Sequence, residues 1–266
     1  MDSERRMSMD ALAELFRLDG KVALVTGGAG ALGSAIARGL AVHGADLAVV
    51  DQPSAQPQSL VEEIEGLGRK VMVTGVDVTD KASVEKMVGE VVKALGGIDI
   101  VVTAAGVASR IPMEDMPIEE WQRVQDVNVR GTYLCCQQVG RWIMENARPG
   151  KIITIGSVRG FQGNPGGYSA YTTSKGAVHA LTKQMATEWA KYHINVNCIA
   201  PAIFWTPLTQ QVLEDKELYD FHMSRIPLGR AGVPDDFVGV AVFLASAASD
   251  FMTGAVVNVD GGWLAS

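Results

Sequence analysis

The chain has 266 residues, of which 47% are apolar, and it carries a formal net charge of −7. This length suits a single large α/β domain, and the acidic balance argues against a nucleic-acid partner, because contacts to phosphates need a basic face. No apolar run approaches the ~20 residues of a membrane-spanning helix, so we expect no membrane partner either.

The first 20 residues are charged and contain no apolar core of the kind found in a secretory signal. Within them, Leu12, Leu15 and Phe16 are spaced as in a short amphipathic turn, which we expect to dock on the body of the protein. The three cysteines are dispersed without CxxC spacing, a pattern typical of buried, reduced thiols. We therefore expect a cytoplasmic location.

From residue 22 onward, short runs rich in Val, Ile and Ala alternate with longer segments of helical period. The strand candidates are nearly continuous in apolar residues, as strands buried on both faces are. They span residues 22–26, 46–51, 70–76, 98–103, 151–156, 194–200 and 255–259. The main helix candidates span residues 31–43, 81–95, 119–145, 168–192 and 234–245. This alternation predicts one doubly wound, Rossmann-type α/β domain over residues 1–266, with a mostly parallel seven-stranded sheet flanked by helices on both faces.

The first strand candidate leads into the glycine-rich sequence TGGAGALG, and a helix candidate follows it. Glycines at such a place permit a tight turn, let the backbone approach a pyrophosphate and allow the helix to pack closely on the strand. The helix N-terminus then offers free N–H groups and the positive end of its dipole to the phosphates. The pattern favours a dinucleotide site that includes Gly27, Gly30, Ala31 and Leu32; the alternative is a plain glycine turn.

Acidic residues end the second and third strand candidates. Asp51 is placed to accept hydrogen bonds from the adenosine ribose hydroxyls and to repel a 2′-phosphate, and residues 52–54 carry no cation that would welcome that phosphate. We therefore predict NAD(H) in preference to NADP(H), with a capping Asp in a surface turn as the alternative. Asp77 and Val78 are expected at the adenine edge, although an Asp that forms a turn fits the same pattern.

Tyr171 and Lys175 lie four residues apart in a helical pattern, which places both on one helix face. A nearby ammonium favours the phenolate and is expected to lower the pKa of Tyr171, so that this phenol can exchange a proton with a carbinol or carbonyl oxygen. Ser157 follows a strand candidate at the carboxyl edge of the sheet, where its hydroxyl can hydrogen-bond the same oxygen. Taken singly, the Tyr–Lys spacing is a common coincidence and Ser157 is a loop residue.

In combination, these residues resemble the short-chain dehydrogenase/reductase family over residues 18–262, nearly the whole chain. The resemblance depends on the order of the motifs TGGAGALG, Asp51, Asp77-Val78, Ala104-Ala105-Gly106, Asn128, Ser157, Tyr171-x-x-x-Lys175, Pro201-Ala202 and Asp260-Gly261-Gly262. It implies an oxidoreductase acting on a secondary alcohol or ketone, in one dinucleotide-binding and catalytic domain. Such a reaction needs no metal, and we expect no metal site.

The same resemblance implies roles for individual residues. Tyr171 would be the general acid/base, Lys175 would bind the nicotinamide ribose and tune Tyr171, and Ser157 would orient the substrate oxygen. Asn128 would hold a water of a proton relay. Ala105 and Gly106 would contact the cofactor, as would Pro201, Ile203 and Thr206 on the nicotinamide side.

Three positions depart from the usual pattern of that family. Ala31 stands at the usual middle glycine of the phosphate loop, where its methyl group could crowd the dinucleotide. Thr103-Ala104-Ala105-Gly106 replaces Asn-Asn-Ala-Gly, and Pro201-Ala202 replaces Pro-Gly. None of these changes removes a catalytic group, so we expect an active enzyme.

Two arginines suggest the substrate class. Arg159 follows Ser157 by two residues and Arg110 follows the Ala105-Gly106 turn, so both are expected at the carboxyl edge of the sheet. Guanidinium groups suit carboxylates, which points to a sugar acid, although both could be ordinary surface arginines. These segments resemble the sugar-acid and polyol dehydrogenases of the family, gluconate 5-dehydrogenases among them. Residues 203–232 break the strand–helix rhythm and are expected to form a substrate lid.

Other functions stay open at this point. The aromatic residues of the lid could line an apolar pocket for a cyclic ketone, and a 3-oxoacyl thioester reductase is a further possibility, which Asp51 disfavours. A catalytically silent dinucleotide-binding regulatory protein is the alternative from another class; the intact Ser157, Tyr171 and Lys175 argue against it. The helix candidates 119–145 and 168–192 carry apolar residues on more than one face, which together with the resemblance predicts a homotetramer.

Overall fold

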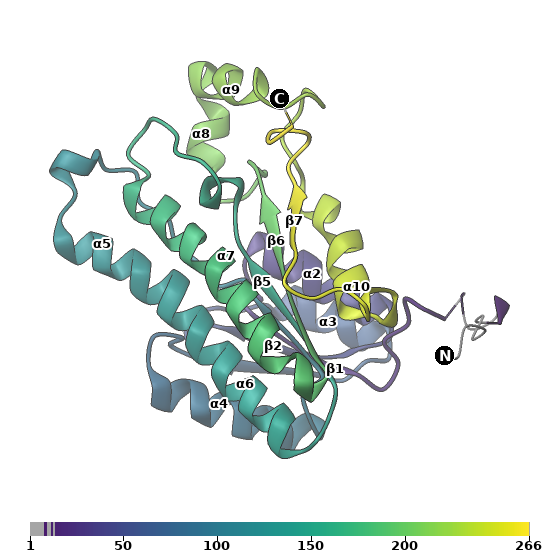
Figure 1. Cartoon of the computed structure of the whole chain (residues 1–266). Helices are drawn as coiled ribbons and strands as arrows, with labels where there is room; N and C mark the ends of the chain where they lie inside the picture. Colours follow the sequence, from purple (N-terminus) through teal and green to yellow (C-terminus); the bar gives the residue numbers. More distant parts are fainter. Residues whose placement is uncertain (1–7, 10–11, 13, 266) are drawn as a thin grey trace.

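The computed structural model describes residues 8–9, 12 and 14–265. Its centre is one seven-stranded sheet in the order β3-β2-β1-β4-β5-β6-β7, and every neighbouring pair is parallel (Figure 1). The strands are β1 (Val22–Thr26), β2 (Asp46–Asp51), β3 (Val71–Gly75), β4 (Ile100–Thr103), β5 (Gly150–Ile155), β6 (Ile194–Pro201) and β7 (Val256–Val259). The predicted doubly wound fold with seven strands is confirmed, and the sheet expected to be mostly parallel is parallel throughout.

Helices cover both faces of the sheet, as Figure 1 shows. They are α2 (Ala31–Val42), α3 (Gln58–Gly66), α4 (Lys81–Leu95), α5 (Ile118–Gln125), α6 (Thr132–Glu145), α7 (Ser169–Trp189), α8 (Gln210–Glu214), α9 (Lys216–Met223) and α10 (Val238–Ala245). One buried cluster joins α2, α3 and α10 to one face of the sheet, and a second joins α4, α6 and α7 to the other. A third, smaller cluster lies under α8 and α9. Because both faces are covered, nearly all side chains of β1, β4 and β5 are buried, which explains their unbroken apolar sequence.

The helix expected over residues 119–145 is interrupted. α5 and α6 are joined by the π-helical segment Asp126–Gly131, in which the backbone bonds reach one residue further than in an α-helix. Thr132 Oγ1 donates to the Asn128 carbonyl at 2.8 Å within this segment. α3, α8 and α9 were absent from the main helix candidates, because α3 buries only Leu60 and Ile64 and the other two are short.

The N-terminal expectation holds in part. Phe16 lies near Phe243 of α10, with 6.5 Å between ring centroids, but both Phe16 and Leu12 are exposed. All three cysteines are buried and free. In the part of the chain that the structure describes, no helix has both the length and the apolar character needed to cross a bilayer.

Candidate active site

A cleft lies at the carboxyl ends of β1 and β4, where the chain reverses the direction in which it adds strands to the sheet. Such switch points are where open α/β sheets bind ligands. The cleft has a volume of about 1130 Å³. Its lining includes half of the predicted cofactor residues, namely Gly27, Gly30, Asp51, Asp77, Val78, Ala105 and Gly106.

The glycine loop between β1 and α2 leaves no room for side chains. Gly27 has a φ of +66°, and a Cβ there would lie 2.7 Å from the Ala105 amide nitrogen. A Cβ at Gly33 would collide with the Gly27 carbonyl oxygen. Gly30 is the N-cap of α2 and no side chain caps it, so the first N–H groups of the helix are left for a ligand. The loop therefore fits a pyrophosphate in shape and in charge.

Two of the predicted loop residues lie at the start of α2 and not in the cleft lining. Ala31 is the first residue of the helix, and Leu32 packs against the core. The loop adopts the tight turn with Ala31 in place, so the methyl group does not prevent its formation. Any contact of these two residues with the cofactor would be made through the backbone of the first helical turn.

Asp51 faces the cleft from the end of β2. Its Oδ2 accepts from the Ala29 N–H at 2.9 Å and its Oδ1 from the Gln52 N–H at 2.8 Å. Each carboxylate oxygen keeps a lone pair for a ribose hydroxyl. Asp77 lines the cleft and also organises a turn, because its Oδ1 accepts from the backbone and hydroxyl of Thr79. The two interpretations of Asp77 are therefore compatible.

The predicted catalytic residues come together beside this cleft. Tyr171 and Lys175 lie on one face of α7, with Lys175 Nζ 5.6 Å from the centroid of the Tyr171 ring. Lys175 Nζ donates to the Ile155 carbonyl at 2.8 Å, and burial lowers its pKa to about 8. Ser157 follows β5; its Oγ accepts from the Arg159 N–H and donates to the Pro201 carbonyl at 3.4 Å.

The expected direction of the Tyr171 pKa is wrong for the protein alone. Burial raises the pKa of Tyr171, and the hydrogen bond from Ser157 and the positive charge of Arg159 offset only part of that rise. Lys175 is committed to the Ile155 carbonyl and is itself desolvated. Desolvation is therefore the dominant influence on the pKa of this phenol.

Asn128 has a structural task that the sequence did not reveal. Its Oδ1 accepts from the Val107 N–H at 2.8 Å, and its Nδ2 donates to the Val107 carbonyl and to Ser174 Oγ, each at 2.9 Å. The amide thereby ties the loop after β4 to α7. A Cβ at Gly106 would lie 3.3 Å from Asn128 Oδ1 and 3.7 Å from Lys175 Nζ, so the loop passes close to both.

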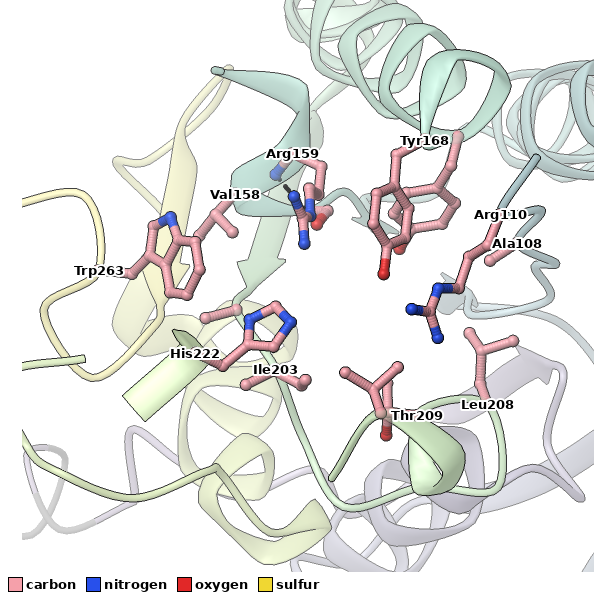
Figure 2. Close-up of a pocket in the computed structure, with 14 residues that line it drawn as sticks. Ala108, Arg110, Val158, Arg159, Tyr168, Ile203, Leu208, Thr209, His222 and Trp263 are labelled. Carbon is pink, nitrogen blue, oxygen red and sulfur yellow. Dashed lines mark hydrogen bonds between the residues drawn. The ribbon is translucent and has the colours of Figure 1, made fainter. Parts of the chain in front are cut away.

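A second pocket, with a volume of about 80 Å³, contains both Ser157 and Tyr171. Arg110 and Arg159 line this same pocket from opposite sides of Tyr168, with their guanidinium carbons 5.7 and 4.3 Å from its ring centroid. Figure 2 shows both guanidinium groups directed toward the middle of the pocket. Within the described residues, neither arginine forms an ion pair with a carboxylate. Both arginines therefore lie at the pocket with their charges uncompensated.

Of the predicted nicotinamide contacts, Pro201 and Ile203 lie at the pocket and Thr206 does not. Pro201 ends β6, and its carbonyl accepts from Ser157 Oγ, while Ile203 lines the pocket. Thr206 lies outside the lining of both cavities, and its hydroxyl is 3.0 Å from that of Thr209. Thr209 rather than Thr206 faces the pocket.

The sequence interpretation missed Tyr168, Thr209, His222 and Trp263, which also line the pocket. Tyr168 and Trp263 contact the arginines through their ring faces. His222 belongs to α9 and stacks near Trp263, with 5.6 Å between ring centroids. Only its position inside the expected lid could have pointed to it. In the described ranges, no group of three or more His, Cys, Asp or Glu side chains is arranged to hold a metal.

Residues 27–264 match a family model described as enoyl-(acyl carrier protein) reductase. The chain is 39% identical over 250 residues to 2-dehydro-3-deoxy-D-gluconate 5-dehydrogenase of Dickeya dadantii, covering 94% of this chain and 98% of that one. A short-chain type dehydrogenase/reductase from Mycobacterium marinum has a TM-score of 0.92 at 40% identity, covering 96% of this chain and 100% of the other. A gluconate 5-dehydrogenase from Burkholderia cenocepacia, in complex with NADP and tartrate, has a TM-score of 0.91 at 36% identity, covering 96% and 99%.

Proposed function

This chain belongs to the short-chain dehydrogenase/reductase family, and we propose that it interconverts a secondary alcohol and a ketone on a sugar acid, with NAD(H) as the cofactor. The observation that carries this proposal is the shared pocket of Ser157, Tyr171, Arg110 and Arg159 beside the nucleotide cleft. If the substrate carboxylate binds near the arginines, its secondary alcohol or ketone can reach Ser157 and Tyr171. The similarity to two gluconate-type 5-dehydrogenases supports the same substrate class.

The chemistry of the site follows from its protein groups. When bound, the nicotinamide accepts or supplies the hydride directly at the substrate carbon. In oxidation, the phenolate of Tyr171 takes the proton of the carbinol oxygen; in reduction, the phenol returns it to the carbonyl oxygen. Ser157 Oγ orients that oxygen, and Lys175 would hold the nicotinamide ribose and stabilise the phenolate. We retain a proton relay through Asn128, whose Oδ1 has one lone pair left beside Gly106.

The preference for NAD is supported by charge at the end of β2. Asp51 would accept from the ribose hydroxyls through its remaining lone pairs, and a 2′-phosphate there would meet a carboxylate. The cleft residues next to Asp51 are Gln52, Pro53 and Ser54, none of them cationic. Arg123, elsewhere in the lining, is paired with Glu120 at 2.7 Å. The Burkholderia relative was crystallised with NADP, so the assignment for this chain depends on Asp51.

Steady-state rates of nicotinamide reduction test the function directly. We expect NAD to support at least about tenfold higher kcat/KM than NADP, because one unfavourable charge contact is worth ~1.4 kcal/mol or more. D-Gluconate should be a better substrate than D-glucitol, which has the same carbon chain without the carboxylate. Equal rates with D-gluconate and D-glucitol would overturn the sugar-acid assignment, and a preference for NADP would overturn the cofactor assignment.

One observation favours a second candidate, a cyclic ketone reductase. The pocket walls are largely apolar, with Val158, Ile203, Leu208, Val212 and Trp263 among the lining residues. Such walls suit a hydrocarbon ring. Reduction of cyclohexanone at a higher kcat/KM than that of any keto sugar acid would favour this candidate.

We also propose a substrate lid, a homotetrameric assembly and a cytoplasmic location for this chain. Residues 203–232 contain α8 and α9, which contribute Val212 and His222 to the pocket, and this supports a role as a substrate lid. We retain the homotetramer as a proposal, for which light scattering should give four times the mass of the 28.3 kDa chain. The free, buried cysteines support a reducing, cytoplasmic location.

A further inference from the structure

His222 lines the substrate pocket without a hydrogen-bond partner among the described residues. It is 4% exposed, and its Nδ1 is buried with no hydrogen-bond partner. No hydrogen bond from either ring nitrogen occurs among residues 14–265. Buried polar groups are nearly always satisfied, and an unpartnered one often marks a ligand-binding position.

The groups around this imidazole are cationic or aromatic. Arg159 comes from the turn after β5, Arg110 from the loop after β4 and Arg225 from the segment just after α9. Tyr168 and Tyr171 face the same pocket from α7 and its N-cap. Arg225 lies over the Trp263 ring at 4.9 Å, and the Asn164 amide lies beside both Arg225 and Arg159. Among the described residues, none of these arginines pairs with a carboxylate.

These surroundings fix the state of the ring. Burial and the three guanidinium groups lower the pKa of His222 to about 4, so the imidazole is neutral at physiological pH. A neutral imidazole has one N–H donor and one bare nitrogen. A carboxylate bound in the pocket would favour the tautomer with the proton on Nε2, because a carboxylate only accepts hydrogen bonds, and Nδ1 would then carry the lone pair. Figure 2 shows one ring nitrogen of His222 turned toward the middle of the pocket.

We infer that His222 is a specificity-determining residue, whose Nε2–H donates a hydrogen bond to the substrate carboxylate that Arg110 and Arg159 attract. The inference rests on the proposed function and deepens it, because it adds a third ligand for the anion from the lid. The two arginines supply charge from segments at the carboxyl edge of the sheet, whereas His222 supplies a neutral donor from α9. An anionic substrate would thereby link the lid to the body of the protein, and an uncharged polyol would not.

The test compares four proteins on two substrates. We would measure kcat and KM of the wild type, His222→Leu, His222→Gln and Met223→Leu with NAD, using D-gluconate and D-glucitol. The glutamine keeps an amide donor at a similar reach. Met223 is on the same helix and packs in the cluster under the lid, outside the pocket lining, so it is the matched control.

His222→Leu should lower kcat/KM for D-gluconate by about tenfold to a hundredfold, chiefly through KM, the range expected for a lost hydrogen bond to a charged group. With D-glucitol the same variant should stay within about twofold, which also shows that it folds and binds NAD. His222→Gln should recover most of the loss, and Met223→Leu should match the wild type. If neither D-gluconate nor D-glucitol is oxidised, the same comparison is made with their dissociation constants, measured by calorimetry in the presence of NADH.

Equal losses of kcat/KM on D-gluconate and D-glucitol would show that His222 only supports the lid. No loss of kcat/KM on D-gluconate would show that His222 does not contact the carboxylate. Either result overturns the inference. The proposed function is judged separately, by the wild type alone. A wild-type enzyme without preference for the acid overturns the acid pocket and the His222 inference together. A wild-type preference that survives in His222→Leu overturns the His222 inference only.

Discussion

The nucleotide cleft and the substrate pocket share one edge of the sheet but are built differently. The cleft depends on backbone: Gly27 and Gly33 bring main chains together where a side chain would collide, and α2 offers its free N–H groups. The pocket depends on side chains from separate segments, among them Arg110, Arg159 and His222. A backbone site is encoded by a short local motif, whereas a side-chain site exists only after distant segments have met.

The two regions also differ in charge. Asp51 gives the cleft a carboxylate whose two oxygens are held by backbone N–H groups. The pocket has the opposite balance, because Arg110 and Arg159 both lie near the Tyr168 ring. Burial also desolvates the Tyr171 phenol and the His222 imidazole there. One region is therefore suited to accept hydrogen bonds from hydroxyls, and the other is suited to bind an anion.

The largest expected effect separates chemistry from cofactor binding. Tyr171→Phe should lower kcat by about 10²–10⁴-fold, because it removes the general acid/base. The dissociation constant of NADH, measured by fluorescence, should change by less than about twofold. Tyr192→Phe, at an exposed position far along the chain from the pocket, serves as the control. Wild-type turnover in Tyr171→Phe would contradict the tyrosine mechanism; inactivity of the wild type on every alcohol tried would favour a silent binding protein.

A smaller effect should be confined to the substrate side. Arg159→Met should raise KM for D-gluconate by about tenfold to a hundredfold, since a charge-assisted hydrogen bond is lost from a buried site. NADH binding and kcat should change little. Arg110→Met should act in the same direction, and Arg141→Met, at an exposed position on α6, should have no effect. An unchanged KM in both Arg159→Met and Arg110→Met would show that these arginines do not bind the substrate.

The cofactor side is tested by adding a single methyl group. Gly33→Ala should weaken NADH binding by about tenfold and lower stability by about 1–3 kcal/mol, because its Cβ would collide with the Gly27 carbonyl oxygen. Gly89→Ala is the matched control, since nothing lies within 4 Å of its Cβ in α4. That change should stabilise the protein by about 0.5–1 kcal/mol in urea unfolding. Unaltered NADH binding in Gly33→Ala would mean that the loop is not the phosphate site.

The smallest effect concerns acid stability. Burial lowers the pKa of His179 and of His222 from 6.5 to about 4, so the unfolded chain binds more protons than the folded one between these values. Stability should therefore fall as the pH drops from 6.5 to about 4. His222→Gln should reduce that slope by at most one proton, or about 1.4 kcal/mol per pH unit.

Urea unfolding at several pH values measures this slope. His193→Asn, which changes an exposed imidazole, should leave it as in the wild type. The same slope in His222→Gln as in the wild type would show that His222 does not need to be neutral in the folded protein.

Much of the fold was readable because its signals are local. The apolar runs of β1, β2, β4 and β6 appear in the sequence almost at their final bounds. The helical spacing alone placed Lys175 one turn from Tyr171, because that relation depends only on helix geometry. The π-helical segment around Asn128 was not readable, since its sequence continues a helical pattern and its amide bonds Val107 and Ser174 in other elements.

The sequence by itself determined the doubly wound sheet, the glycine loop and the Tyr–Lys face, because periodicity and backbone requirements act over short stretches of chain. Only the tertiary structure decided that His222 and Arg159 line one pocket, that Thr209 and not Thr206 lines it, and that burial raises the pKa of Tyr171. These outcomes depend on desolvation and on contacts between segments far apart in the chain, and no local pattern encodes either.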